Sequence, residues 1–394
     1  MPALTGFSAA IADLEARMTR ELAALEAASR RRRLRPPAGE DFCSNDYLGL
    51  ADHPALRQAA VRALAGGLAL GGASARLVRG EHPAFAELEQ AFAAFVGAEA
   101  ALFFSSGYAA NVGLIAALAG KGDLIFSDQL NHASLIDGVR LSGAERVRVA
   151  HNDLAAWQQA FAAHPPRAEQ RRLAIVESVH GMEGDRAPLA ALAELCARAE
   201  VALIVDEAHA TGLCGPGGAG AVAADGVRGQ VLATVHTCGK ALGAAGALVA
   251  GSAVLRDYLI NRARTFIYAT APPPWLARQV LEAMRLAASE SWRRERVLEL
   301  ARQLRRRLRA AGLETGPDAE GSAIVPVILG ADARALAVAD ALARAGYDAR
   351  AIRPPTVPEN TARLRVTLHA NQTAAAVEGF AAALAAALRA PLAS

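Results

Sequence analysis

The stretch Val201–His209, "VALIVDEAH", is a run of five apolar residues that leads into two acids and a histidine. A run this uniformly apolar is typical of a strand that is buried on both faces. Similar short apolar runs alternate with helical patterns from about residue 80 onward, at 101–106, 123–128, 172–178, 231–237 and 246–251. Strands that alternate with crossover helices predict an α/β fold with a doubly wound, mostly parallel sheet.

The pattern changes on both sides of this region. Residues 8–34 have apolar side chains at helical spacing, and Pro36 and Pro37 follow them. After a helical stretch at about 275–313, the chain predicts a small α+β unit, with strands at 322–329, 348–355 and 362–369, a helix at 331–345 and a final helix. We therefore expect an N-terminal helix and arm (1–50), a large domain (51–285) and a small C-terminal domain (286–394).

The bulk composition excludes several classes of protein. The 42 basic and 39 acidic residues nearly balance, which gives no sign of a nucleic-acid partner. Four cysteines lie far apart in sequence with no CxxC pair, so neither a metal site nor a disulfide framework is expected. The N-terminus lacks the apolar core of a signal peptide, and no stretch predicts a bilayer span. The sequence thus predicts a cytoplasmic protein without a membrane partner.

Polar residues and glycines follow nearly every predicted strand of the large domain. They lie in the segments 105–108, 127–132, 177–178, 206–209 and 237–240. Because ligands of open α/β sheets bind beyond the carboxyl ends of the strands, these segments predict one shared site.

Lysine is rare in this chain, which makes each lysine informative. Only two of the 42 basic residues are lysines, Lys121 and Lys240. A lysine amine can lose its proton and form a Schiff base with a carbonyl, whereas an arginine guanidinium stays charged. Lys121 lies in a glycine-flanked turn, where a solvated lysine is ordinary. Lys240 follows a predicted strand, in "HTCGKALG", and is the candidate for chemistry.

Asp206 gives that lysine a chemical partner. A lysine that serves pyridoxal phosphate needs a carboxylate to keep the pyridine nitrogen protonated. Asp206 ends the apolar run "VALIV", where a carboxylate without a cationic partner would be costly. A helix-capping or loop aspartate is the simpler alternative for this position.

The segment "SSGYAANVGLIAAL" (105–118) offers a place for a phosphate. Its serines and glycine lead into a helical pattern near Tyr108, and the N–H groups at a helix start bind phosphate. His132 and His209 follow strands and are candidates for stacking on a cofactor ring and for hydrogen bonding to its 3′ oxygen. Each of them, taken singly, is as compatible with an ordinary polar role.

The "DEAH" sequence at 206–209 also suggests a nucleotide-driven helicase. Such an enzyme needs G-x-x-x-x-G-K-[ST], but Thr234 replaces the first glycine before Lys240 and Ala241 replaces the hydroxyl residue. The segment around Lys121 fails in the same way. No G-x-G-x-x-G follows an early strand, so a dinucleotide enzyme is not indicated either.

The order of these motifs resembles the α-oxoamine synthases, pyridoxal-phosphate enzymes of fold type I that join an amino acid to an acyl thioester with loss of CO2. The resemblance covers most of the chain, through "FCSNDYLGL" (42–50), "SSGYAAN" (105–111), "LNHASL" (130–135), "HNDL" (151–154), "DEAHATG" (206–212), "HTCGKALG" (236–243), "RTFIYAT" (264–270) and "IRPPTVPENTARLRVTL" (352–368).

The resemblance implies a role for each matching residue. Lys240 would bind the cofactor and move the substrate α-proton, Asp206 would pair with the pyridinium, His132 would stack on the ring, and His209 would reach the 3′ oxygen. Phosphate contacts would come from the backbone of Gly107 and Tyr108, with Thr237 adding a hydroxyl to the cofactor pocket and Thr270 acting across a homodimer interface. Arg353, Thr356 and Arg31 would bind substrate.

The segment "IRPPTVP" is most similar to members that join L-alanine to a pimeloyl thioester, carried on CoA or on an acyl carrier protein. Two other classes stay open: sister enzymes such as glycine C-acetyltransferase or 5-aminolevulinate synthase, and a cofactor-binding protein without turnover. Two features depart from the family pattern. Gly181 replaces the usual serine of a cofactor contact, and the segment after the run Arg30–Arg33 is about ten residues short. A solvated helix end is the alternative interpretation of that arginine run.

Overall fold

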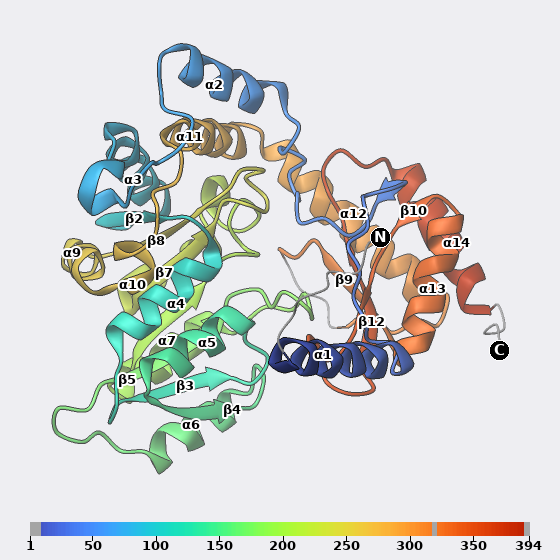
Figure 1. Ribbon diagram of the computed structural model, residues 1–394, viewed down its shortest axis with the longest axis horizontal. Coiled ribbons are helices and arrows are strands. Elements are labelled where there is room, and N and C mark those ends of the chain that lie inside the picture. The colour runs from blue at the N-terminus through green and yellow to red at the C-terminus, as the bar shows by residue number, and fades with distance from the viewer. Residues whose placement is uncertain (1–8, 317–320, 390–394) are drawn as a thin grey trace.

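The computed structural model describes residues 9–316 and 321–389. The first eight residues of the predicted N-terminal arm and residues 390–394 of the predicted small domain lie outside this range. Figure 1 shows two side-by-side units, one built on a large sheet and one from the C-terminal third of the chain, with the N-terminal helix beneath the second. In the described ranges, no helix has a stretch long and apolar enough to cross a bilayer.

A seven-stranded sheet organises the large unit and confirms the predicted doubly wound α/β fold. Its order is β2-β8-β7-β6-β5-β3-β4, and all strands run parallel except β8, which is antiparallel to both of its neighbours. The strands are β2 (Ala100–Phe104), β3 (Leu124–Asp128), β4 (Glu145–Val149), β5 (Arg172–Glu177), β6 (Ala202–Asp206), β7 (Val231–Thr237) and β8 (Ala247–Gly251).

Helices cover both faces of this sheet because successive residues of each strand point to opposite sides. On β6, Ile204 packs into one hydrophobic cluster, while Leu203 and Val205 pack into the other. The first cluster is covered by α4 (Gly107–Leu118), α5 (Ala133–Ser142), α9 (Ala253–Arg262) and α10 (Arg264–Ile267). The second is covered by α3 (Pro83–Val96), α6 (Leu154–Ala163), α7 (Leu189–Arg198) and α11 (Pro274–Ser289). The large unit also contains α2 (Pro54–Ala65), α8 (Ala221–Ala224) and the short turns η1 (Arg76–Gly80), η2 (Pro216–Gly218) and η3 (Arg228–Gln230).

Strand β4 is the one strand of the large sheet that the sequence did not predict. It lies at the sheet edge, and its residues alternate polar and apolar in "ERVRV". A uniformly apolar run marks a strand that is covered on both faces, and an edge strand does not need one.

The C-terminal unit contains a three-stranded sheet of order β11-β12-β9. Its elements are α12 (Ser291–Ala310), β9 (Ile324–Gly330), α13 (Asp332–Arg344), β10 (Tyr347–Asp348), β11 (Ala351–Ile352), β12 (Ala362–Thr367) and α14 (Ala374–Arg389). The strand predicted at 348–355 is wrong in extent, because this segment forms only the short strands β10 and β11 and then turns at Pro354.

The N-terminal helix also ends earlier than predicted. Helix α1 spans Ala9–Ala27, and Ser29 has a positive φ of 57°, a left-handed conformation that interrupts the helix. The arginine run therefore does not form the end of the helix, and the interpretation of the run as a solvated helix end is wrong. The run lies beyond the helix against the C-terminal unit, where Arg30 Nε donates to Asp332 Oδ2 at 2.7 Å. Strand β1 (Glu40–Asp41) then pairs in parallel with β10.

Candidate active site

Lys240 lies at the carboxyl-end edge of the large sheet, three residues after β7. Its Nζ is 2.7 Å from Nε2 of His209, and the side chain is half-buried. Burial lowers the pKa of Lys240 to about 8, although the charges of Asp206 and Glu177 oppose the shift. About a tenth of this amine is therefore neutral at pH 7, far more than for a solvated lysine. Lys121, by contrast, is exposed in its turn.

Asp206 is the last residue of β6, next to β7 in the sheet. Its carboxylate is buried and accepts hydrogen bonds from Nδ2 of Asn111, at 2.7 Å, and from the backbone N–H of Ala208, at 2.9 Å. Each donor holds one oxygen, so the carboxylate is fixed in place by the chain itself. The positions of Asp206 and Lys240 on neighbouring strands agree with the predicted site at this edge.

His209 is held between two segments that are distant in sequence. Its Nε2 faces Lys240, and its Nδ1 lies 2.7 Å from the hydroxyl of Tyr47. Burial, followed by the charges of Lys240 and Arg365, lowers the pKa of His209 well below its ordinary value, so the ring is neutral. Arg365 Nη2 also donates to the Tyr47 hydroxyl at 3.2 Å.

Tyr47 and Arg365 are site residues that the sequence analysis missed. Tyr47 lies in the quoted segment "FCSNDYLGL" but follows no strand of the large sheet, and Arg365 lies in the middle of β12. The signal available in the sequence was an arginine within a predicted strand, because arginine is rarely buried there without a partner. In the structure Arg365 is only 6% exposed.

Glu177, the last residue of β5, positions His132. One Glu177 oxygen accepts the backbone N–H of His132 at 2.6 Å, and the other accepts the N–H of Gly181 at 3.0 Å. Burial, reinforced by the nearby charge of Asp206, raises the pKa of Glu177 to about 8. The His132 ring caps α5 through Nδ1, which accepts from the N–H of Ser134, and its face is open to solvent.

The start of α4 lies close to Thr237, and this junction of Ser106, Gly107 and Thr237 is called the cradle. The cap of α4 is Ser106, whose hydroxyl accepts the N–H of Ala109 at 3.1 Å. A Cβ at Gly107 would lie 2.4 Å from Cγ2 of Thr237, so only glycine fits there. The buried hydroxyl oxygen of Thr237 has no hydrogen-bond partner among the described residues. Tyr108 is half-exposed and donates its hydroxyl hydrogen bond to Asp137 at 2.5 Å.

Gly181 lies against His209. A Cβ at this position would be 2.6 Å from Nε2 of His209, well inside contact distance. A serine there would require the histidine to move. The departure from the family pattern is therefore linked to the present position of the His209 ring beside Lys240.

The remaining predicted residues have their contacts with other parts of the described chain. Arg353 donates to the carbonyl of Ser29, and Arg32 Nη2 reaches the hydroxyl of Thr356 at 3.3 Å. Arg31 pairs with Glu26 at 3.6 Å. Arg31, Arg32 and Arg353 border a groove between the N-terminal arm and the C-terminal unit. Thr270 is exposed, and no contact joins it to Lys240 within the described chain.

The fold and the residues at this edge of the sheet match a known class of protein. A family model for aminotransferase class I and II matches residues 39–384, and the chain belongs to this family. The chain is 47% identical over 381 residues to the 8-amino-7-oxononanoate synthase of Anaeromyxobacter dehalogenans, covering 93% of this chain and 94% of the relative. It is 48% identical over 346 residues to that of Aromatoleum aromaticum, covering 87% of each. Within its family the chain therefore belongs with the 8-amino-7-oxononanoate synthases.

Solved structures agree with this assignment. A serine palmitoyltransferase from S. paucimobilis with bound PLP–myriocin superposes with a TM-score of 0.87 at 28% identity, covering 96% of this chain and 98% of that one. The 8-amino-7-oxononanoate synthase from Francisella tularensis gives a TM-score of 0.77 at 28% identity, covering 89% and 98%. The chain is thus a PLP-dependent acyltransferase of fold type I.

The residues present fit pyridoxal phosphate. The cradle at Gly107 offers backbone donors and the unpartnered hydroxyl of Thr237 to a phosphate. Asp206 supplies a fixed carboxylate for the pyridinium, and Lys240 supplies an amine that is partly neutral. The donor set of the site therefore matches the charged groups of the cofactor.

Proposed function

We propose that this enzyme condenses L-alanine with a pimeloyl thioester, on CoA or an acyl carrier protein, to give 8-amino-7-oxononanoate, CO2 and the free thiol of the carrier, for biotin synthesis in the cytoplasm. The observation that carries the chemistry is the 2.7 Å contact between Lys240 Nζ and His209 Nε2, beside the fixed carboxylate of Asp206. The names of the relatives support the choice of product.

The cofactor, when bound, supplies an electron sink for the charge that develops at the α-carbon of the substrate. Lys240 holds the cofactor and, once released, takes the α-proton on Nζ. A pKa of about 8 suits this exchange, because the amine can both lose and accept a proton near neutral pH. Asp206 would hold the ring nitrogen and keep it protonated. The neutral His209 offers a hydrogen bond to the 3′ oxygen.

Other side chains position the two substrates. His132 would hold the cofactor ring, and the N–H groups of Gly107 and Tyr108 with the hydroxyl of Thr237 would hold the phosphate. Arg353 and Thr356 bind the carboxylate of alanine, because a guanidinium forms paired hydrogen bonds with a carboxylate. Arg31 binds the distal end of the acyl chain or the phosphates of its carrier.

Substrate choice is tested by kcat/KM for alanine with pimeloyl thioester against glycine with acetyl- or succinyl-CoA. We expect kcat/KM to be higher for alanine with pimeloyl thioester. If glycine with a short acyl group wins, the chain is a sister enzyme such as glycine C-acetyltransferase or 5-aminolevulinate synthase. Arg31→Ala should raise the KM of the acyl donor far more than that of alanine. Arg33→Ala is the matched control, because Arg33 pairs with the same Glu26.

We further propose an obligate homodimer in which Thr270 reaches the phosphate of the partner's site. Helix α1 supports this proposal, because its apolar residues Ile11, Leu14, Met18, Leu22 and Leu25 are each between 42% and 57% exposed. Mixing Lys240→Ala chains with Thr270→Val chains tests the shared site. If Thr270 acts across the interface, each heterodimer has one intact site and one site with both defects. Activity confined to the Thr270→Val level would place Thr270 in its own chain's site.

A further inference from the structure

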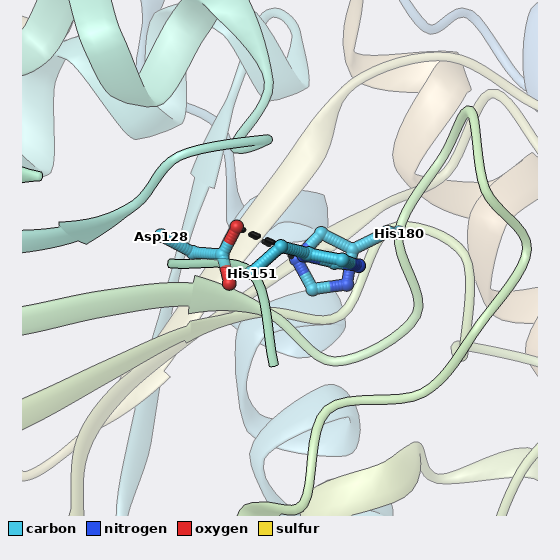
Figure 2. Close-up of side chains that lie close together, drawn as sticks. All are labelled: Asp128, His151 and His180. Carbon is cyan, nitrogen blue, oxygen red and sulfur yellow. Dashed lines mark hydrogen bonds and ion pairs between the residues drawn. The ribbon is translucent and has the colours of Figure 1, made fainter. Parts of the chain in front are cut away.

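Three ligand-type side chains meet at the same sheet edge but outside the cofactor site. Asp128 ends β3, His151 lies two residues after β4, and His180 lies three residues after β5. Figure 2 shows the carboxylate of Asp128 directed at the two imidazole rings, which come from different loops. One ligand atom from each residue lies within 4.8 Å of the other two. In residues 9–316 and 321–389 this is the one such group of three or more.

The surroundings of His180 are unusual for a structural histidine. The side chain is fully buried, yet neither ring nitrogen has a hydrogen-bond partner in the described part of the chain. Nε2 lies 3.8 Å from Oδ1 of Asp128, and Nδ1 lies 3.7 Å from Oδ1 of Asp185. A buried polar group without a partner costs roughly 1–3 kcal/mol, so a buried ring with two such groups is expensive unless something binds it.

Asp185 lies beside both rings but is hydrogen-bonded only to His151. Its Oδ2 lies 2.8 Å from Nε2 of His151, whereas its Oδ1 lies 3.7 Å from Nδ1 of His180, beyond hydrogen-bond distance. The other nitrogen of each ring points to Oδ1 of Asp128, at 3.0 Å for His151 Nδ1. A carboxylate that accepts one N–H of a histidine fixes the tautomer and leaves the opposite nitrogen free to bind a metal.

We propose that Asp128 Oδ1, His151 Nδ1 and His180 Nε2 bind a divalent transition-metal ion of the zinc type, with Asp185 orienting His151. Imidazole and carboxylate ligands suit zinc and similar ions, and three protein ligands leave one tetrahedral position for water. Ligands about 2.0 Å from zinc stand about 3.3 Å apart, close to the observed 3.0 and 3.8 Å.

The acid groups around the rings also favour a cation at this place. The carboxylates of Asp128 and Asp185 both face the two imidazole rings. Asp128 is buried, and a buried carboxylate is less costly when it binds a cation.

The metal would join three loops at the rim of the active site. Asp128 accepts the N–H of Leu130 at 2.8 Å, two residues before His132, and the N–H of Asn152 at 3.0 Å. His180 directly precedes Gly181, which contacts His209. The ion would therefore stabilise the loops that carry these residues without entering the reaction.

The test uses the cofactor-loaded enzyme after dialysis against a chelator. Titration with Co²⁺ should give the visible absorption bands of a tetrahedral nitrogen–oxygen site, and equilibrium dialysis with Zn²⁺ should give about one ion per chain, with a higher Tm. His180→Phe preserves the size of the ring and should abolish this binding. Asp185→Asn should weaken it about 10- to 100-fold. His82→Asn, which changes a helix-capping histidine elsewhere, is the control and should bind normally.

Wild-type enzyme that shows no saturable Zn²⁺ binding would overturn the proposal. Equal binding by His180→Phe would do the same, and so would a Co²⁺ spectrum with thiolate charge-transfer bands, which would place the ion on the cysteines. The visible absorbance of bound cofactor reports whether each variant is folded. If His180→Phe fails that check, His151→Gln serves in its place, with loss of binding expected and unchanged binding counting against the site.

Discussion

The edge of the large sheet and the arginine arm (residues 29–35) handle charge in opposite ways. At the sheet edge, Asp206 and His209 are buried, and each is held by partners within the chain. On the arm, Arg30 and Arg33 are partly exposed and form ion pairs with acids at the surface. The difference teaches that burial changes ionisation at the sheet edge, where it lowers the pKa values of Lys240 and His209. The guanidinium groups of the arm are charged and accessible, which suits the substrate-binding role that we propose for this part of the chain.

The strongest test of the comparison is Lys240→Ala. We expect activity to fall by about 10⁴-fold or more, because both the covalent hold on the cofactor and the proton transfer are lost. Reduction with borohydride followed by peptide mapping should find the cofactor on Lys240 in the wild type. The control Lys121→Ala should keep full activity, and a cofactor on Lys121 would refute the assignment.

Arg353→Ala should have the next largest effect. Loss of a guanidinium that binds the alanine carboxylate should raise the KM for alanine by about 10- to 100-fold, since charged hydrogen bonds contribute roughly 1.5–3 kcal/mol. The control is Arg350→Ala, three residues away, where the exposed guanidinium pairs with Asp348. Equal effects of the two variants on KM would mean that Arg353 supports the arm and does not bind substrate.

The desolvation of Lys240 predicts a pH dependence. In the enzyme stripped of cofactor, only the neutral amine can react, so the rate of cofactor capture should rise with pH and level off above about 8. Asp206 opposes the lowering of this pKa, so Asp206→Asn should move the midpoint to lower pH, by up to about one unit. Stopped-flow absorbance at several pH values measures both midpoints. A midpoint near 10 in the wild type would mean that the amine is solvated.

The smallest effect should come from the arm. Arg30→Ala removes two ion pairs, with Asp332 and Glu359, and should lower the free energy of unfolding only slightly, as is usual for accessible pairs. Ile204→Ala, in the middle of β6, should lower it by about 2–5 kcal/mol. Urea unfolding of both variants provides the comparison. A larger loss for Arg30→Ala would show that the arm is integral to the fold.

The sequence predicted the interior of the large sheet well because burial on both faces leaves a run such as "VALIV" with few other interpretations. Strand β4 was not predicted because a strand at the sheet edge can contain charged residues such as Arg146 and Arg148. The end of α1 was placed too late because proline was taken as the stop, whereas the left-handed residue Ser29 ends the helix first.

Within the site, residues that follow strands could be predicted and residues that arrive from elsewhere could not. Lys240 and Asp206 stand at strand ends, where the sheet itself brings them together. Tyr47 reaches His209 from the segment after β1, and Arg365 reaches Tyr47 from the small sheet. Their contact depends on how the two units dock, and no local periodicity encodes that. The same holds for His151 and His180, whose loops meet only in the folded chain.

The short pairing of β1 with β10 has a mechanical consequence. Glu40 and Asp41 are hydrogen-bonded in register with Tyr347 and Asp348, and Arg30 is tied to Asp332 on α13. These contacts attach the N-terminal arm to the C-terminal unit at two points along the arm. Any rocking of that unit relative to the large sheet would carry the arm with it as one rigid body. The distance between Arg31 and Arg353 would then stay constant, while the distance from each of them to Lys240 changes.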